Sequence, residues 1–337
     1  MKSAPTEITP YPELLDRVDL ATLSEVNRAE LRRLSHEIFR HYRGSDRAAV
    51  RGQRRHEIVV VLVGVFGTLA ILVALAELAR VPIPASAEVI AVGIAAAGVA
   101  LGLFAALQHS WLLRRHQAER YQLLMWGLLI DPHLWSPSAA AAAAVLTKVE
   151  ANLRRLQRLS YKNVEAWLDG DERLSEIDER AGPSPPSLTS LYCEVRLRGQ
   201  ARYFSDRSRS HRRLDRWTRR IPLSAFILSV AAALGHFARD VVIRDSEVGV
   251  GLWLLCAAAG IPILAGAVRI IRAALEPARN SSRYHGKHKL IEGLIRRIQH
   301  EDRGTGALFR DYLHGEQLLE AEHREWLRLM VESEWIG

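Results

Sequence analysis

The segment RYFSDRSRSHRRLDRWTRR, residues 202–220, is followed at once by IPLSAFILSVAAALGHF, residues 221–237. The first stretch is rich in arginine, and the second contains no Asp, Glu, Lys or Arg. A basic stretch alone is typical either of a nucleic-acid contact or of the edge of a membrane-spanning segment. The apolar run that follows favours the membrane edge, because about 20 apolar residues in a helix cover a hydrocarbon core of roughly 30 Å.

Three other apolar runs accompany the one at 221–237. They are residues 58–76, 89–107 and 248–268, and none of them contains a charged side chain. These three are long enough to span a bilayer, and the run at 221–237 is slightly short. A helix of a soluble protein usually keeps a polar face, which these runs lack. We therefore expect an all-α membrane protein with four transmembrane helices arranged as two hairpins.

Arginines around the runs predict the topology. They gather before the first run, after the second, before the third and after the fourth, whereas the two connectors at 77–88 and 238–247 carry few. An excess of Arg and Lys marks the cytoplasmic side, so the N-terminus, the central region and the C-terminus are all expected in the cytoplasm. The partner of these side chains would be a bilayer with anionic headgroups. The membrane-interface candidates are Arg54, Arg55, Arg114, Arg115, Arg212, Arg213, Trp217, Arg219 and Arg220.

The segments outside the membrane are expected to form long amphipathic helices. We divide the chain into an N-terminal helix with the first hairpin (1–135), a cytoplasmic helix and linker (136–180), and the second hairpin with C-terminal helices (181–337). Thr22-x-x-Glu25 has the capping-box pattern of a helix start. The helix near residues 138–168 is expected to bury one stripe. That stripe consists of Ala142, Leu146, Val149, Leu153 and Leu156.

The two halves of the chain follow a similar order. HYRGSDR (41–47) and RYFSDR (202–207) each place a tyrosine near Ser-Asp-Arg, and each continues through a basic stretch into an apolar hairpin and then a basic helix. This order suggests two copies of one helix–hairpin–helix unit. Chance similarity between two basic flanks is the alternative.

Small residues and a proline in the runs point to helix packing and gating. Gly98 and Gly102 form a G-x-x-x-G pattern, which permits close approach of helices within one chain or between chains. Pro262, after Gly260, is expected to break the helix of residues 248–268 midway. The break would be either a gate hinge or a bend that helps packing.

No enzyme signature emerges. His36 and His41 are five residues apart, whereas a zincin helix needs histidines four apart. His285 and His288 lack an evident third metal ligand. Cys193 and Cys256 offer neither a disulfide framework nor a cysteine zinc site. We expect a protein without catalytic residues, cofactor or metal.

The combination resembles the SLATT group of bacterial two-transmembrane effector domains, including the DUF4231-type members. The resemblance rests on HYRGSDRAAVRGQRRH (41–56) with LLRRHQAERYQLLMWGLLIDPHLW (112–135), and on RYFSDRSRSHRR (202–213) with SRYHGKHKLIEGLI (282–295). It implies an inner-membrane effector of bacterial antiphage or conflict systems. Such an effector would oligomerise and form a pore or disrupt the membrane when a nucleotide-sensing or nucleotide-synthesising partner signals.

Two other functions remain open at this stage. The chain could be a non-conducting membrane anchor or scaffold that recruits soluble partners through residues 138–168 and its C-terminal helices. It could also be a housekeeping ion channel gated at Pro262. No specific nucleic acid is expected, because only Tyr203, Phe204 and Trp217 interleave the basic stretch with aromatic rings.

Overall fold

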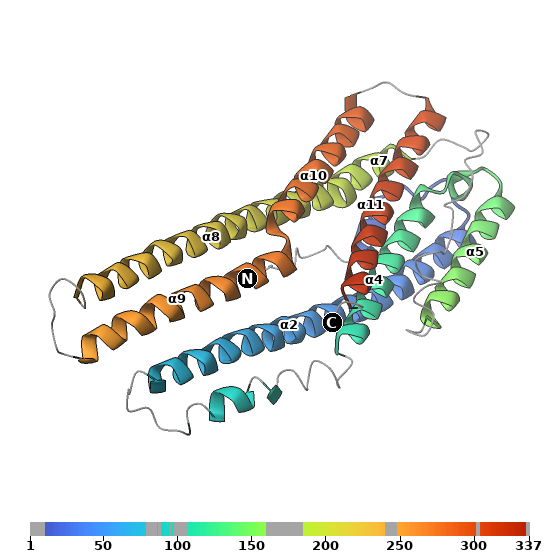
Figure 1. Ribbon diagram of the computed structural model, residues 1–337. Helices are drawn as coiled ribbons and strands as arrows, with labels where there is room; N and C mark the ends of the chain where they lie inside the picture. Colours follow the sequence, from blue (N-terminus) through green and yellow to red (C-terminus); the bar gives the residue numbers. More distant parts are fainter. Residues whose placement is uncertain are drawn as a thin grey trace. The chain divides into compact units, whose positions relative to one another are not determined.

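The computed structural model describes residues 11–78, 86, 89–94, 96–97, 107–159, 185–239, 248–300 and 304–334 (Figure 1). These residues form helices and turns, with no strand in the described ranges, so the all-α prediction is confirmed. The elements, in chain order, are α1 (Tyr11–Leu15), α2 (Glu25–Leu78), α4 (Leu107–Ile130), η1 (Pro132–Trp135), α5 (Ala139–Gln157), α7 (Pro186–Leu191), η3 (Tyr192–Leu197), α8 (Arg198–Phe237), α9 (Val248–Leu275), α10 (Pro277–His300) and α11 (Thr305–Glu334).

The chain divides into two compact units, and each unit draws on both halves of the sequence. The first unit comprises Met1–Gln53, Gln108–Tyr203 and Lys287–Gly337. The second unit comprises Arg54–Leu107 and Phe204–Gly286. Helices α2, α4, α8 and α10 each contribute residues to both units.

The first unit has a conventional apolar core of packed helices. On α2, Leu31, Leu34 and Ile38 are completely buried. The whole stripe predicted on α5 is buried as well, together with Val145, so this prediction is confirmed. Polar contacts between α5 and α2 include the Asn27 amide, which donates to the Ala139 carbonyl at 3.0 Å, and the pair of Arg33 with Glu150 at 3.2 Å.

Helix α2 begins at Glu25, and its cap differs from the predicted one. The side-chain oxygen of Ser24, not that of Thr22, accepts a hydrogen bond from the backbone N–H of Asn27 at 3.3 Å. The backbone carbonyl of Ser24 also accepts from Arg28 at 2.9 Å. Ser24 therefore occupies the N-cap position. The capping-box prediction was wrong by two residues, because another hydroxyl stood closer to the first helical turn.

In the second unit, α8 packs along α9 and the start of α10 in antiparallel fashion (Figure 1). The Ser208 hydroxyl donates to the Ser281 carbonyl at 2.9 Å, and the Ser281 hydroxyl donates to the Ser208 carbonyl at 3.1 Å. Further along, Asp215 accepts from Arg272 at 2.9 Å. The Ser229 hydroxyl then donates to the carbonyl of residue 258 at 2.7 Å. The contact residues rise along α8 from 208 to 229 while those on α10 and α9 fall from 281 to 258. These contacts therefore define one interhelical seam.

Two described helices are long and apolar enough to cross a membrane, against the four predicted. They are Pro186–Phe237, which contains the run at 221–237, and Val250–Arg269. Only 6 % of each apolar window is buried, which is the opposite of a core helix in a soluble protein. The run at 58–76 lies within α2, but its apolar helical stretch, Val65–Glu77, is shorter than a span. Most of the run at 89–107 lies outside the described residues.

Pro262 lies inside a continuous α9, so the predicted break is absent. Proline lacks an N–H group and therefore leaves the carbonyl four residues earlier without its helical donor. That carbonyl belongs to Ala258, and it is the one that accepts the hydrogen bond from Ser229 of α8. The neighbouring helix thus supplies the donor that the proline removes, and α9 stays helical.

We predict that Ser229→Ala lowers the stability of the second unit by about 1 kcal/mol, because the Ala258 carbonyl then loses its remaining donor. In a Pro262→Ala background the same substitution should cost much less, since the alanine N–H can satisfy that carbonyl. Thermal unfolding of the four proteins in lipid nanodiscs measures this cycle. Equal costs in both backgrounds would show that Ser229 does not compensate for the proline.

Candidate functional site: the buried ionic network of the first unit

A short π-helical segment, η3, connects α7 to α8. It contains Tyr192, Cys193, Arg196 and Leu197, all of which are buried. A π turn is wider than an α turn and is frequent at functional sites, because it redirects side chains that a regular helix would point elsewhere. Here it places a tyrosine and an arginine in the interior of the first unit.

Arg196 forms a bidentate ion pair with Glu316 of α11. Arg196 Nε donates to Glu316 Oε1 at 3.0 Å, and Arg196 Nη2 donates to Glu316 Oε2 at 2.7 Å. The two side chains are 3 % and 0 % exposed. At this depth the Coulomb attraction must offset the loss of hydration of both charges, which requires that their remaining hydrogen-bonding groups also find partners.

Neighbouring helices provide those partners. Arg196 Nη1 donates to Gln122 Oε1 of α4 at 2.8 Å, and the Gln122 amide donates to the Tyr42 hydroxyl of α2 at 3.3 Å. The Tyr192 hydroxyl donates to Glu316 Oε1, at 3.1 Å, and lies 3.2 Å from the Tyr312 carbonyl. The network therefore joins α2, α4, η3 and α11.

Close packing keeps this network in one geometry. Trp126 and Tyr192 meet edge to face, with ring centroids 5.6 Å apart. A Cβ atom added to Gly315 would lie 2.5 Å from the Tyr192 hydroxyl, so α11 can approach η3 only where that residue is glycine. Burial, with the Glu316 carboxylate nearby, raises the pKa of Tyr192 well above its usual value. Tyr192 thus remains a neutral donor at physiological pH.

A pair of buried histidines lies elsewhere on the α4–α11 contact. His116 Nδ1 and His323 Nε2 are 3.0 Å apart, and the residues are 4 % and 8 % exposed. Two neutral rings can satisfy this contact, with one nitrogen donating and the other accepting, whereas two charged rings would set two donors face to face. Arg120 and Glu320 form an ion pair at 2.8 Å between the same two helices.

The surroundings of the histidines favour their neutral forms. Burial, with Arg115, Arg120 and Arg324 nearby, lowers the pKa of His323 to about 3. Burial and the adjacent His323 also hold the pKa of His116 well below its usual range. No third His, Cys, Asp or Glu in the described part of the chain completes a metal site with them. The pair is therefore an uncharged contact between α4 and α11.

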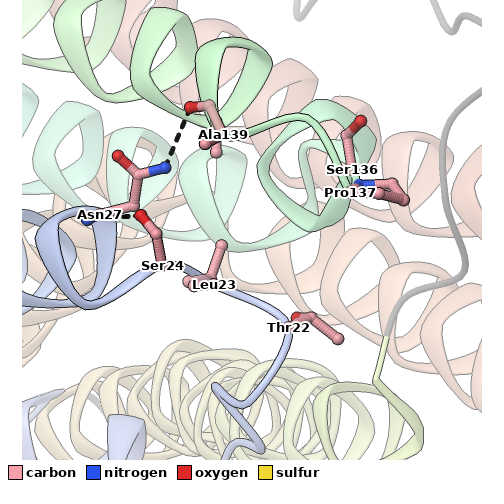
Figure 2. Close-up of a pocket in the computed structure, with 8 residues that line it drawn as sticks. Thr22, Leu23, Ser24, Asn27, Ser136, Pro137 and Ala139 are labelled. Atoms are coloured by element: carbon pink, nitrogen blue, oxygen red, sulfur yellow. Dashed lines mark hydrogen bonds between the residues drawn. The ribbon is translucent and has the colours of Figure 1, made fainter.

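A cavity of about 310 Å³ lies elsewhere in the first unit, where α2 and α5 begin (Figure 2). Thr22, Ser24, Asn27 and Ser136 contribute polar groups to it, and its lining contains no charged side chain. The Asn27 amide is already bonded to the Ala139 carbonyl, as Figure 2 shows. This arrangement offers hydroxyl groups but neither a nucleophile with a base nor a charge for a ligand.

The residues predicted for helix packing and gating lie in different surroundings. Gly260 is buried, and a Cβ atom there would lie 3.4 Å from the Leu72 side chain of α2, so this glycine does serve close helix packing within the chain. Pro262 is exposed on α9. Gly98 and Gly102 lie outside the described residues.

The predicted interface residues fall into two groups. Arg54 and Arg55 on α2 are exposed in the second unit, and so are all those on α8. In the first unit, Arg114 is exposed and within hydrogen-bonding distance of Gln117, whereas Arg115 forms ion pairs with Asp46 and Glu119. The α8 residues concerned are Arg212, Arg213, Trp217, Arg219 and Arg220.

Sequence reasoning did not find the ionic network, although α11 carries a signal. Glu316 and His323 interrupt a stripe of apolar residues at helical spacing. A charged or titratable residue at a core position of an amphipathic helix indicates a buried partner. The stripe is Phe309, Tyr312, Glu316, Leu319, His323 and Leu327, all of them buried.

No family model, curated protein or solved structure matches this chain.

We predict that Arg196→Met destabilises the protein by about 3–5 kcal/mol, because it leaves the Glu316 carboxylate buried without its counter-charge. The paired replacement Arg196→Met with Glu316→Leu should recover most of that loss. Chemical unfolding of the purified proteins measures both effects. A double variant no more stable than the single one would show that the pair is not energetically coupled.

The histidine pair predicts an acid-sensitive stability. Because the pKa of each histidine is lower in the folded than in the unfolded chain, the unfolded chain binds more protons as the pH falls. The stability contributed by the pair is present above about pH 6.5 and is lost progressively as the pH falls from there toward 3. Unfolding experiments from about pH 7.5 to about pH 5, across the unperturbed histidine pKa of about 6.5, should show a steeper loss of stability for the natural chain than for His116→Gln/His323→Gln. Parallel pH profiles would contradict this assignment.

Proposed function

We propose that this chain is a bacterial inner-membrane effector whose first unit controls its membrane-spanning helices. In this proposal the chain spans the membrane four times as two hairpins, with both termini in the cytoplasm. It oligomerises and forms a pore, or disrupts the membrane, when a partner protein acts on the first unit in an antiphage or conflict system. The resemblance to SLATT-type domains supports the class of function.

One structural observation carries the proposal. The segments α7, η3 and α8 form one uninterrupted helix from Pro186 to Phe237, over 52 residues. Near its start it contains Arg196, held by the buried Glu316, and at its end it exposes large apolar side chains. In this proposal, a change in the first unit at Arg196 acts through this helix on residues suited to a bilayer. The exposed apolar side chains include Leu223, Phe226, Ile227, Leu228, Leu234 and Phe237.

The chemistry of the first unit supports a switch more than a catalyst. Arg196, Glu316 and Tyr192 are almost completely buried and satisfied by one another, which leaves them out of reach of a substrate in this state. A buried ion pair is costly to break and leaves two charges that need new partners. Such an element favours two discrete arrangements over continuous deformation.

The test is expression in bacterial cells with an impermeant DNA-binding dye as a reporter of membrane damage. We expect the natural chain without its partner to leave cells intact, and Arg196→Met to permeabilise them because the network is released. The paired replacement Arg196→Met with Glu316→Leu restores an uncharged core and should return cells to the intact state. Membrane-fraction yields control for expression.

Other outcomes would contradict the proposal in recognisable ways. An anchor or scaffold predicts no dye entry for any of the three proteins at equal membrane yields. A housekeeping channel predicts that the natural chain already conducts in planar bilayers and that Pro262→Ala changes its conductance. Equal dye entry for Arg196→Met and for the paired variant would show that leakage does not depend on the network.

A further inference from the structure

The face of α8 opposite its packing seam carries a row of arginines. Ser208 and Asp215 lie in the seam against α9 and α10. Arg213 and Arg220 each stand five residues beyond one of them, a rotation of about 140° around a helix with 3.6 residues per turn. Arg209 and Arg216 complete the row at spacings of four, three and four residues, and all four side chains are exposed. They form a stripe that points away from the hairpin.

Three of these arginines have no counter-charge within the described protein. Arg209 pairs with Asp206 at 2.6 Å, but Arg213, Arg216 and Arg220 pair with no described carboxylate. The nearby Asp215 is already shared by two other arginines, Arg219 and Arg272. Elsewhere in the chain, buried or half-buried arginines such as Arg196 and Arg120 face carboxylates. The uncompensated charge at this stripe fits an anionic partner from outside the chain.

The same stripe becomes apolar within one turn. Leu223 and Ile227 follow Arg220 at three and seven residues, and they are 62 % and 59 % exposed. About ten residues of helix cover the roughly 15 Å of one leaflet. Leu223 and Ile227 therefore lie at the depth of the acyl chains if Arg220 is at the headgroups. Trp217, 62 % exposed, stands one turn from Arg213 and Arg220, where an amphipathic ring suits the boundary.

We propose that this stripe binds an anionic phospholipid of the leaflet that adjoins Arg220. The lipid phosphate is held by the guanidinium groups of Arg213, Arg216 and Arg220, which can each donate two hydrogen bonds to phosphate oxygens. Its acyl chains lie along Leu223 and Ile227. This inference rests on the proposed function only in requiring that α8 spans a membrane; it does not require pore formation.

The experiment uses the purified full chain in a neutral detergent, with phosphatidylglycerol or phosphatidylcholine added as probe and bound lipid counted by native mass spectrometry. We expect phosphatidylglycerol to bind more tightly, and Arg213→Gln/Arg216→Gln/Arg220→Gln to weaken it roughly 100-fold, since three charges at an anionic headgroup are lost. Arg154→Gln/Arg155→Gln/Arg158→Gln, at the end of α5 and its C-cap, removes the same net charge from exposed positions and should change the affinity less than about twofold.

A single conservative change distinguishes a specific phosphate site from general electrostatic attraction to anionic lipid. Arg216→Lys keeps the charge but removes the planar two-donor group, so binding should weaken measurably while net charge is unchanged. Equal binding of the two lipids, an unaffected stripe variant, or equal losses in the α5 variant would each overturn the proposal. So would a short DNA duplex that displaces the phospholipid at equal concentration, which would assign the stripe to nucleic acid instead. None of these outcomes depends on dye entry into cells.

Discussion

The ion pair between Arg196 and Glu316 is the constraint on which the first unit depends. An arginine and a glutamate with almost no exposed surface are tolerated because Gln122 accepts from Arg196 and Tyr192 donates to Glu316, while Tyr42 accepts from Gln122. Those partners come from α2, α4 and η3, so the pair specifies how these helices meet α11. A purely apolar core could be equally stable, but it would not demand one register among four segments.

The second unit is held together by a different kind of contact. Its large apolar side chains face outward, so burial of apolar surface within the unit cannot be its main stabilising term. Small polar groups in the α8 seam take over: the reciprocal Ser208–Ser281 pair, and Ser229 at the carbonyl that Pro262 leaves without a helical donor. An unsatisfied backbone carbonyl away from water is costly, which gives a reason for a proline in α9 to coincide with a hydroxyl on its neighbour.

Helical periodicity in the sequence predicted the helices, but it did not predict the contacts between residues far apart in the sequence. The stripe of α5 and the buried Leu31, Leu34 and Ile38 of α2 follow from helical spacing alone. The π segment does not, because its wide turn depends on Arg196 reaching a glutamate 120 residues away. The unbroken helix at Pro262 has the same origin, because it depends on the Ser229 hydroxyl of a neighbouring helix. The α2 cap is different: the contact between Ser24 and Asn27 is local, and the sequence offered two hydroxyl candidates for it.

Within the proposed function, η3 limits which movements of α8 are compatible with its seam. A π turn holds more residues than an α turn, so converting η3 to regular helix would turn α8 about its axis. That rotation would move Ser208, Asp215 and Ser229 out of their seam and leave the Ala258 carbonyl without a donor. Rotation of α8 alone is therefore opposed at each of these contacts, so within the proposed function α8 and α9 are expected to move together.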